Sequence, residues 1–428
     1  MARNGGAQNR KERPESGFVA QPAELLVISI VWILTRAFMI AQLGFGRGGK
    51  IHYADVGIFH VWSDQIARGT LPTDDGWQYP PGAAILFLLP RVFPQFEVGF
   101  VALVLVFDII ATVALIAIGR SERSHAGVWL WVLTLPVLST LPLLRYDVFP
   151  TAIALVAFAV SAGEKVRDRL FGIVVGMGIA IKAWPVLVLL SAPSFRRGWT
   201  ALTAAAATFL LITAVTWAAL GNTLGFLSRH AGRGLEIEAV AATPWYILQV
   251  VFGRGVKWIA RNGCGEIDSP VADIIASILI VAMVLLGFAL ALWWLAWQLS
   301  SAPKTAAVGR DATFTALLLY VVVSEVLSPQ YLIWLIGLGA AAIASPTCRV
   351  RRPVLAVVVA VILTAALLAS FGDLVTGKPY GAYILTLRNI VLLAAAVDAA
   401  IIMVRLVLPL RFASPSDLLA AMRKAPAS

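Results

Sequence analysis

Repeated apolar runs constrain this chain more than any other feature of its sequence. Residues 23–43, 98–118 and 271–299 each hold about the 20 residues that a helix needs to cross a bilayer, with few charges. The composition agrees, because 60% of the residues are hydrophobic, 13% are charged and the mean hydropathy is +0.85. Backbone groups inside a bilayer must bond to one another, so we predict an all-α polytopic integral membrane protein.

The spacing of these runs predicts about 11 to 13 membrane helices. Residues 82–93 are short for a span and suit an interfacial or re-entrant helix in the first outer loop. Residues 170–194 fit either one span or two short helices that meet near Lys182 and Pro185, and the proline and the preceding glycines favour two. The other expected spans cover residues 23–43, 98–118, 127–143, 148–162, 200–220, 271–299, 312–327, 331–344, 353–371 and 389–408.

The net charge of +11 comes from short basic clusters between the apolar runs. This is the positive-inside pattern and not a nucleic-acid-binding patch, so we expect no nucleic-acid partner. It predicts a cytoplasmic basic tail over residues 1–22, one transmembrane domain over 23–410 and a cytoplasmic tail over 411–428. The outer loops are then residues 44–96 and 221–270. The first apolar run is long enough to span, so we expect an anchor and not a cleaved signal peptide.

The sequence offers little support for a disulfide or a metal site. Cys264 and Cys348 fall on opposite sides of the membrane in this topology and are not expected to pair. Asp74 and Asp75 fit a turn, and two adjacent carboxylates are a weak metal signal. Within the spans, Asp108 is expected to neutralise Arg36 as a buried structural pair.

The first outer loop is unusually polar and aromatic for a chain that is otherwise mostly membrane. Asp55 precedes apolar residues with helical period, so we expect it near the start of a helix that lies along the membrane surface; those residues are Val56, Phe59, Trp62 and Ile66. A carboxylate there is favoured by the helix dipole and stays ionised, as a general base must. The alternative is that Asp55 only caps the helix.

Other polar residues fall at the outer ends of spans, each with a structural alternative. Arg145 and Asp147 stand at one junction, where a local ion pair is as plausible as substrate contact. Lys182 lies at the tip of the expected helical hairpin. The alternating charges of residues 233–238 are also typical of a solvated face. The polar break at residues 328–331 also fits a simple turn.

Taken in order, these pieces resemble the GT-C glycosyltransferases. Asp55, the aromatic-rich helix, Gly69 and the Tyr79-Pro80-Pro81 motif are closest to glycosyltransferase family 87, the polyprenol-phosphate-mannose-dependent mannosyltransferases, with arabinofuranosyltransferases among the relatives. Four further motifs match in the same order over roughly residues 20–410: RYD at 145–147, KAWP at 182–185, RGLEIE at 233–238 and SPQY at 328–331. One departure is Gly57, where family members often carry a second acidic residue, and this argues against a tight metal-binding pair.

The resemblance implies a GT-C fold and a role for each candidate residue. Asp55 would be the general base of an inverting transfer at the outer face of the membrane, without metal or cofactor. Three cations would bind the donor phosphate: Lys182, Arg145 and Arg233. Seven residues would contact substrate: Tyr53, Trp62, Tyr79, Asp147, Glu236, Gln330 and Tyr331.

The implied reaction moves a sugar from a polyprenyl-phosphate donor to a glycolipid or glycan of the cell envelope, in contact with membrane lipids. Mannose is favoured by family frequency, and a polyprenyl-phosphate arabinofuranosyltransferase is the nearest alternative. A non-catalytic transporter or flippase of lipid-linked sugars is the other. Transporters place their charges at the membrane midplane in paired repeats, whereas here the polar residues gather at the outer surface, which favours the enzyme.

Overall fold

The computed structural model describes residues 22–45, 47–72, 77–161, 168–221, 225–226, 232–261 and 263–408, with the backbone alone for residues 45 and 47–54. Helices dominate this part of the chain. Those of the N-terminal half are α1 (Pro22–Phe45), α2 (Arg47–Ala67), α3 (Ala83–Leu88), η1 (Leu89–Val92), α4 (Phe96–Glu122), α5 (Ala126–Thr134), η2 (Leu135–Leu138), α6 (Leu141–Leu144), α7 (Val148–Ser161), α8 (Asp168–Ile181), η3 (Trp184–Ser191) and α9 (Phe195–Leu220).

The C-terminal half adds one short hairpin to its helices. The elements are η4 (Val240–Ala242), α11 (Thr243–Phe252), β1 (Trp258–Arg261), β2 (Cys264–Ile267), α12 (Pro270–Leu299), α13 (Ala306–Val323), α14 (Tyr331–Ile343), α15 (Arg351–Ala369), α16 (Phe371–Val375) and α17 (Pro379–Val407). The strands β1 and β2 pair antiparallel, with Trp258 opposite Ile267. The sequence predicted only a loop here, because four-residue strands are too short to show a periodic pattern.

Seven of the described helices are long and apolar enough to cross a membrane: α1, α4, α9, α12, α13, α15 and α17. Five shorter apolar helices of 10–17 residues accompany them. The prediction of an all-α polytopic membrane protein is therefore confirmed, while the expected number of membrane helices stays a prediction.

Two predicted spans differ from the structure at prolines. The span expected over residues 127–143 is divided into α5, η2 and α6, because Pro136 and Pro142 have no backbone N–H to continue an α-helix. The last span, expected to begin at residue 389, begins at Pro379, which starts α17 as prolines commonly do. Most other long spans begin and end within a few residues of the prediction.

Residues 170–194, which the sequence allowed to be either one span or two short helices, form two short helices, as the proline and the glycines favoured. The α-helix α8 ends at Ile181, and the 3₁₀ helix η3 begins at Trp184, so Lys182 lies between them. The backbone of α8 approaches α9 closely: a Cβ added at Gly172 or Gly176 would meet the carbonyl oxygens of Ala201 and Ala205 at 2.3 and 2.5 Å.

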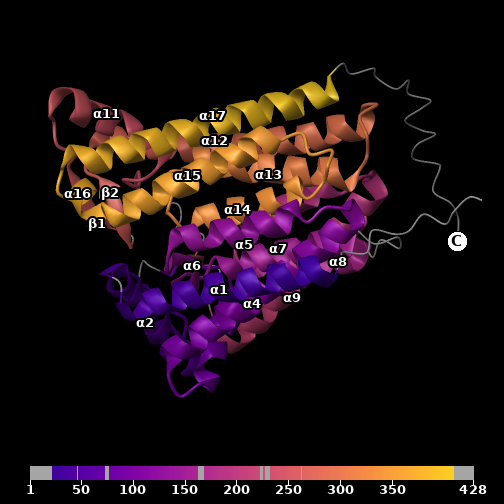
Figure 1. Ribbon diagram of the computed structural model, residues 1–428, viewed down its shortest axis with the longest axis horizontal. Coiled ribbons are helices and arrows are strands. Elements are labelled where there is room, and N and C mark those ends of the chain that lie inside the picture. Colours follow the sequence, from indigo (N-terminus) through magenta and orange to yellow (C-terminus); the bar gives the residue numbers. More distant parts are fainter. Residues whose placement is uncertain are drawn as a thin grey trace, which may run out of the picture.

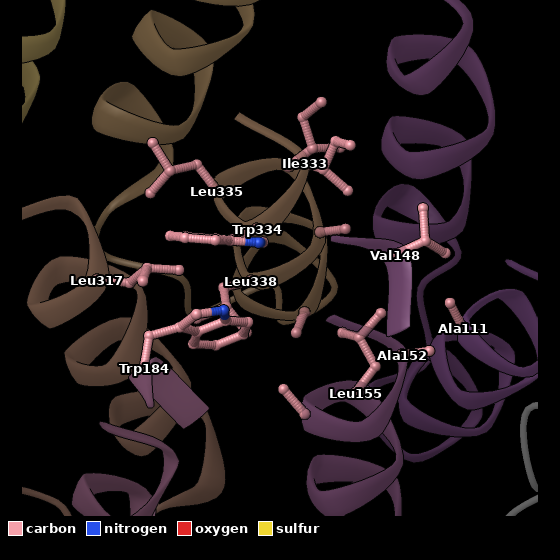
Figure 2. Close-up of a cluster of buried hydrophobic side chains, with 14 of the residues drawn as sticks. Ala111, Val148, Ala152, Leu155, Trp184, Leu317, Ile333, Trp334, Leu335 and Leu338 are labelled. Atoms are coloured by element: carbon pink, nitrogen blue, oxygen red, sulfur yellow. The ribbon is translucent and has the colours of Figure 1, made fainter. Parts of the chain in front are cut away.

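Helices of the two halves run roughly alongside one another, and α14 packs between them (Figure 1). Figure 2 shows Trp334 of α14 above Trp184 of η3 in this contact, with ring centroids 5.6 Å apart. At one end of the molecule lie α2, α11, α16 and the β1–β2 hairpin (Figure 1).

The two charges that were expected to pair inside the spans, Arg36 and Asp108, do so. Arg36 of α1 donates two hydrogen bonds to Asp108 of α4, at 2.7 and 3.0 Å, and both side chains are almost fully buried. The indole of Trp131 donates a third hydrogen bond to the carboxylate at 2.6 Å. Such satisfied pairs keep the cost of burying charge low, so the pair has a structural role.

Candidate active site

A cavity of about 1480 Å³ lies at the end of the molecule that holds α2 and the hairpin. Its walls come from α2, the η2–α6 segment, the α8–η3 junction, Phe226, Arg233, residues 236–238, the β1–β2 hairpin, the 328–331 turn and the α15–α16 junction. Nine of the eleven candidate residues line it: Asp55, Trp62, Tyr79, Arg145, Lys182, Arg233, Glu236, Gln330 and Tyr331. Asp147 lies behind the wall, and the side chain of Tyr53 is outside the described part.

Asp55 lies in the third turn of α2, which begins at Arg47. The prediction that it stands near the helix start is wrong, and the helix dipole falls off too quickly along a helix to keep this carboxylate ionised. The apolar face was predicted correctly, since its four residues are at most 5% exposed: Val56, Phe59, Trp62 and Ile66. This buried face turns Asp55 toward the cavity.

Arg145 pairs with Asp55 across the fold and not with its neighbour Asp147. One Nη atom of Arg145 lies 2.8 Å from an oxygen of Asp55, and both side chains are 25% exposed. Burial raises the pKa of Asp55 above its ordinary value, and the positive charge of Arg145 opposes that shift. The carboxylate is therefore a stronger base than an exposed aspartate. The Nε of Arg145 is buried without a partner.

Lys182 is held by one carboxylate and three aromatic rings. Its Nζ lies 3.6 Å from Oδ1 of Asp147, and the same oxygen accepts a hydrogen bond from the indole of Trp334 at 2.9 Å. The same ammonium lies over the rings of Tyr79 at 5.0 Å, Trp334 at 5.2 Å and Tyr331 at 5.9 Å. Cation–π contacts of this kind stabilise a cation that has left water. Asp147 therefore acts on the cavity through Lys182.

The two glutamates of the RGLEIE motif are buried, so the alternative of a solvated face is wrong. Glu238 binds Arg388 of α17, with Oε2 and Nη1 2.7 Å apart. Glu236 is 6% exposed, its Oε1 accepts a hydrogen bond from Ser328 at 3.1 Å, and its Oε2 has no partner. Burial, and secondly the charge of Glu238, raise the pKa of Glu236 to about 7.

Arg233 differs from the other two cations of the cavity. It donates to the sulfur of Cys264 at 3.2 Å, and within the described residues it forms no ion pair with a carboxylate. The sequence offered no sign of Cys264 as a partner, because the hairpin that carries it was not predicted. Both cysteines are free thiols.

Several buried polar atoms around the cavity have no partner. They are the Nε atoms of Arg145 and Arg233, the indole nitrogen of Trp184, Oε2 of Glu236 and Oε1 of Gln330. Buried polar groups in proteins are nearly always hydrogen-bonded. A ligand that fits this wall must therefore offer both hydrogen-bond donors and acceptors.

Comparisons with known proteins give a match to a family profile and to a curated relative. The sequence profile of glycosyltransferase family 87 matches residues 77–329, which is more than half of the chain. A curated relative, the polyprenol-phosphate-mannose-dependent alpha-(1-2)-phosphatidylinositol pentamannoside mannosyltransferase of Mycolicibacterium smegmatis, is 30% identical over 216 residues, which are 46% of this chain and 49% of the relative. The chain thus spans about half the length of that relative. No solved structure matches the chain.

Proposed function

Because the chain belongs to glycosyltransferase family 87, we propose that it transfers a sugar, with mannose favoured, from a polyprenyl phosphate to a glycolipid or glycan of the cell envelope. The chain is an integral multi-pass membrane protein. The observation that carries the proposal is a large cavity whose wall holds Asp55, its most exposed carboxylate, together with cations and buried hydroxyl-binding groups.

Asp55 takes the proton of an acceptor hydroxyl, and the hydroxyl oxygen attacks the anomeric carbon of the donor sugar. The bond between that carbon and the phosphate oxygen breaks, with inversion. The lipid phosphate leaves with the bonding electron pair, and the proton stays on Asp55. The phosphate thereby changes from a singly charged diester to a monoester that carries about one further negative charge.

Three cations lie where they can bind the donor phosphate: Arg233, Lys182 and Arg145. Arg145 also orients Asp55, and Lys182 is positioned by Asp147. Positive charge that is fixed in place stabilises a leaving group as its negative charge grows.

The sugar and the acceptor bind the remaining wall. Aromatic faces for sugar rings come from Trp62, Tyr79 and Tyr331, and hydrogen-bond acceptors for hydroxyls come from Glu236 and Gln330. Tyr53 precedes Asp55 by two residues in α2, and its substrate contact stays a prediction. The N-terminus lies in the cytoplasm and the cavity faces the outer side, in agreement with the basic clusters.

A transfer assay tests the proposal. Purified protein is incubated with radiolabelled polyprenyl-phosphate-mannose and membrane glycolipids. We expect wild type to label a glycolipid, and Asp55→Asn to lower turnover by roughly two to four orders of magnitude, because that is the usual contribution of a general base. Asp268→Asn removes an exposed carboxylate of the same end of the molecule and is the matched control.

Three outcomes would contradict the proposal. Normal transfer by folded Asp55→Asn protein would exclude Asp55 as the base. Transfer from a polyprenyl-phosphate-arabinose donor in place of the mannose donor would identify the alternative sugar. Movement of the donor across vesicle membranes without any transfer would identify a flippase.

A further inference from the structure

The proposed function gives Glu236 no part in the chemical step, yet this residue places an unpartnered carboxylate oxygen in the cavity wall. The residue is 6% exposed, and only its other oxygen is occupied, by the hydroxyl of Ser328. Its charge acts on Arg233, the cavity cation without a carboxylate partner among the described residues. Arg233 is thus free to bind phosphate, and the carboxylate of Glu236 lies beside it. A carboxylate at this position weakens the binding of any anion, so its presence requires a physical reason.

The charge of the bound lipid phosphate gives a reason for a carboxylate at this position. Before transfer the phosphate is a diester with one negative charge, and after transfer it is a monoester with a second pKa near 6. Both forms place anionic oxygens against Arg233, whereas the monoester alone adds a second negative charge to the same pocket. A neighbouring carboxylate therefore opposes the spent lipid more than the loaded donor.

Resting on the proposed function, we propose that Glu236 is a selectivity residue that discriminates the sugar-loaded phosphodiester from the spent polyprenyl monophosphate, and so promotes release of the product lipid. Its free Oε2 can also accept a hydrogen bond from a hydroxyl of the loaded sugar, a contact that the spent lipid lacks. Both effects favour the donor over the product at one position.

Glu236 faces ionisable groups from every element packed against it. Its own segment contributes Arg233 and Glu238, and α14 and α11 contribute Tyr331 and Tyr246. The hairpin contributes Cys264 and Glu266, the second of which forms an isolated bridge with Glu236. Glu325, whose backbone carbonyl accepts a hydrogen bond from the Glu236 N–H, interacts with the same Arg233. Burial raises the pKa of the Cys264 thiol to about 11, so this group stays neutral between pH 6 and 8. Glu238 is bound to Arg388. Glu266 is bound to Arg261, so Glu236 and Glu325 are the carboxylates of this group that form no ion pair among the described residues, and of these two Glu236 lines the cavity.

Equilibrium binding of two matched probes tests the inference without turnover. Farnesyl phosphate is a monoester, and its methyl ester is the corresponding diester. Dissociation constants are measured by isothermal titration on the purified full chain at pH 8, for wild type, Glu236→Gln and the exposed control Asp268→Asn. We expect Glu236→Gln to bind the monoester about tenfold more tightly, as expected for removal of one nearby charge, with the diester changed less than about twofold.

The pH dependence of binding provides a second measurement. As pH rises from 6 to 8, both the monoester and Glu236 gain negative charge. The cations of the cavity favour the doubly charged monoester, whereas ionised Glu236 opposes it. The affinity for the monoester relative to that for the diester should therefore rise less with pH in wild type than in Glu236→Gln.

Equal changes in both affinities in Glu236→Gln, or no change in either affinity together with the same pH dependence as wild type, would overturn the inference. Wild type that binds both probes but transfers no sugar would contradict the proposed function and leave this discrimination intact. Wild type that binds neither probe would overturn both.

Discussion

The carboxylate of Asp147 lies behind the cavity wall and contacts two donors from that wall. They are the ammonium of Lys182 at 3.6 Å and the indole of Trp334 at 2.9 Å. Arg145, two residues earlier, turns to Asp55. Adjacent opposite charges thus pair with distant partners, because Asp147 is buried below the wall while Arg145 reaches into the cavity. Both charges are thus compensated within the protein.

Removing Lys182 tests this arrangement. In Lys182→Met the buried carboxylate of Asp147 keeps only the indole donor, and breaking a buried pair in this way costs about 3 kcal/mol or more. We expect a lower unfolding temperature and much slower transfer. Lys182→Met combined with Asp147→Asn should recover the unfolding temperature but not the rate, since the cation near the phosphate is still missing.

Both quantities are measured on purified protein, by thermal unfolding in one detergent and by turnover at saturating donor. Lys182→Arg should keep part of the rate, because guanidinium retains the charge in a different shape. A single Lys182→Met variant with wild-type stability and a rate within about twofold of wild type would show that Lys182 only extends toward water.

The candidate residues could be predicted from sequence, and their partners could not. Polar residues at the outer ends of apolar runs led to the cavity residues, because ionisable groups near a membrane are costly without a function. The pairing of Asp55 with Arg145 depends on the rotation of α2 relative to α6, which no local pattern encodes. The burial of Glu236 and Glu238 was missed because their alternation resembles a solvated face.

Among the elements, the long spans were predictable and the short ones were not. Hydropathy alone located α4, α9 and α12 closely, since the bilayer imposes their length. The β1–β2 hairpin and α11 lie in a segment that was predicted only as an outer loop. Their structure depends on packing against α17 and the cavity wall, which a short sequence window does not reveal.

The contact between α8 and α9 gives a prediction at this scale. In Gly176→Ala the new Cβ meets the carbonyl oxygen of Ala205 at 2.5 Å, so the helices must separate. We expect a loss of roughly 1–3 kcal/mol of stability, as for other overpacked sites. The control is Gly287→Ala in α12, where nothing lies within 4 Å and alanine favours the helix.

Thermal unfolding of both variants in the same detergent measures the effect. Gly176→Ala should unfold at a lower temperature than wild type, whereas Gly287→Ala should unfold at the same temperature or higher. Equal unfolding temperatures for the two variants would contradict the close approach of α8 and α9.

In the whole molecule, the charged residues of the cavity and the exposed apolar side chains of α12 lie in different regions. The cavity and its charges gather at the end that holds α2, α11 and the hairpin (Figure 1). Large apolar side chains stay exposed along α12, as suits a helix that faces lipid. A donor with a lipid tail and an anionic head would approach such a molecule from the bilayer with its head at the level of the cavity.

This arrangement predicts which ends of the helices face outward. In a Cys264→Ser, Cys348→Ser background, Asp268→Cys at the exposed start of α12 should react with a membrane-impermeant thiol reagent added to intact cells. Arg196→Cys, exposed at the start of α9 near the opposite end, should react only after the membrane is permeabilised. The reason is that, in the proposed orientation, the two short helices α8 and η3 return the chain to the cytoplasmic side before α9 begins. Labelling of Arg196→Cys in intact cells, with Asp268→Cys protected, would reverse the orientation and place the cavity on the cytoplasmic side.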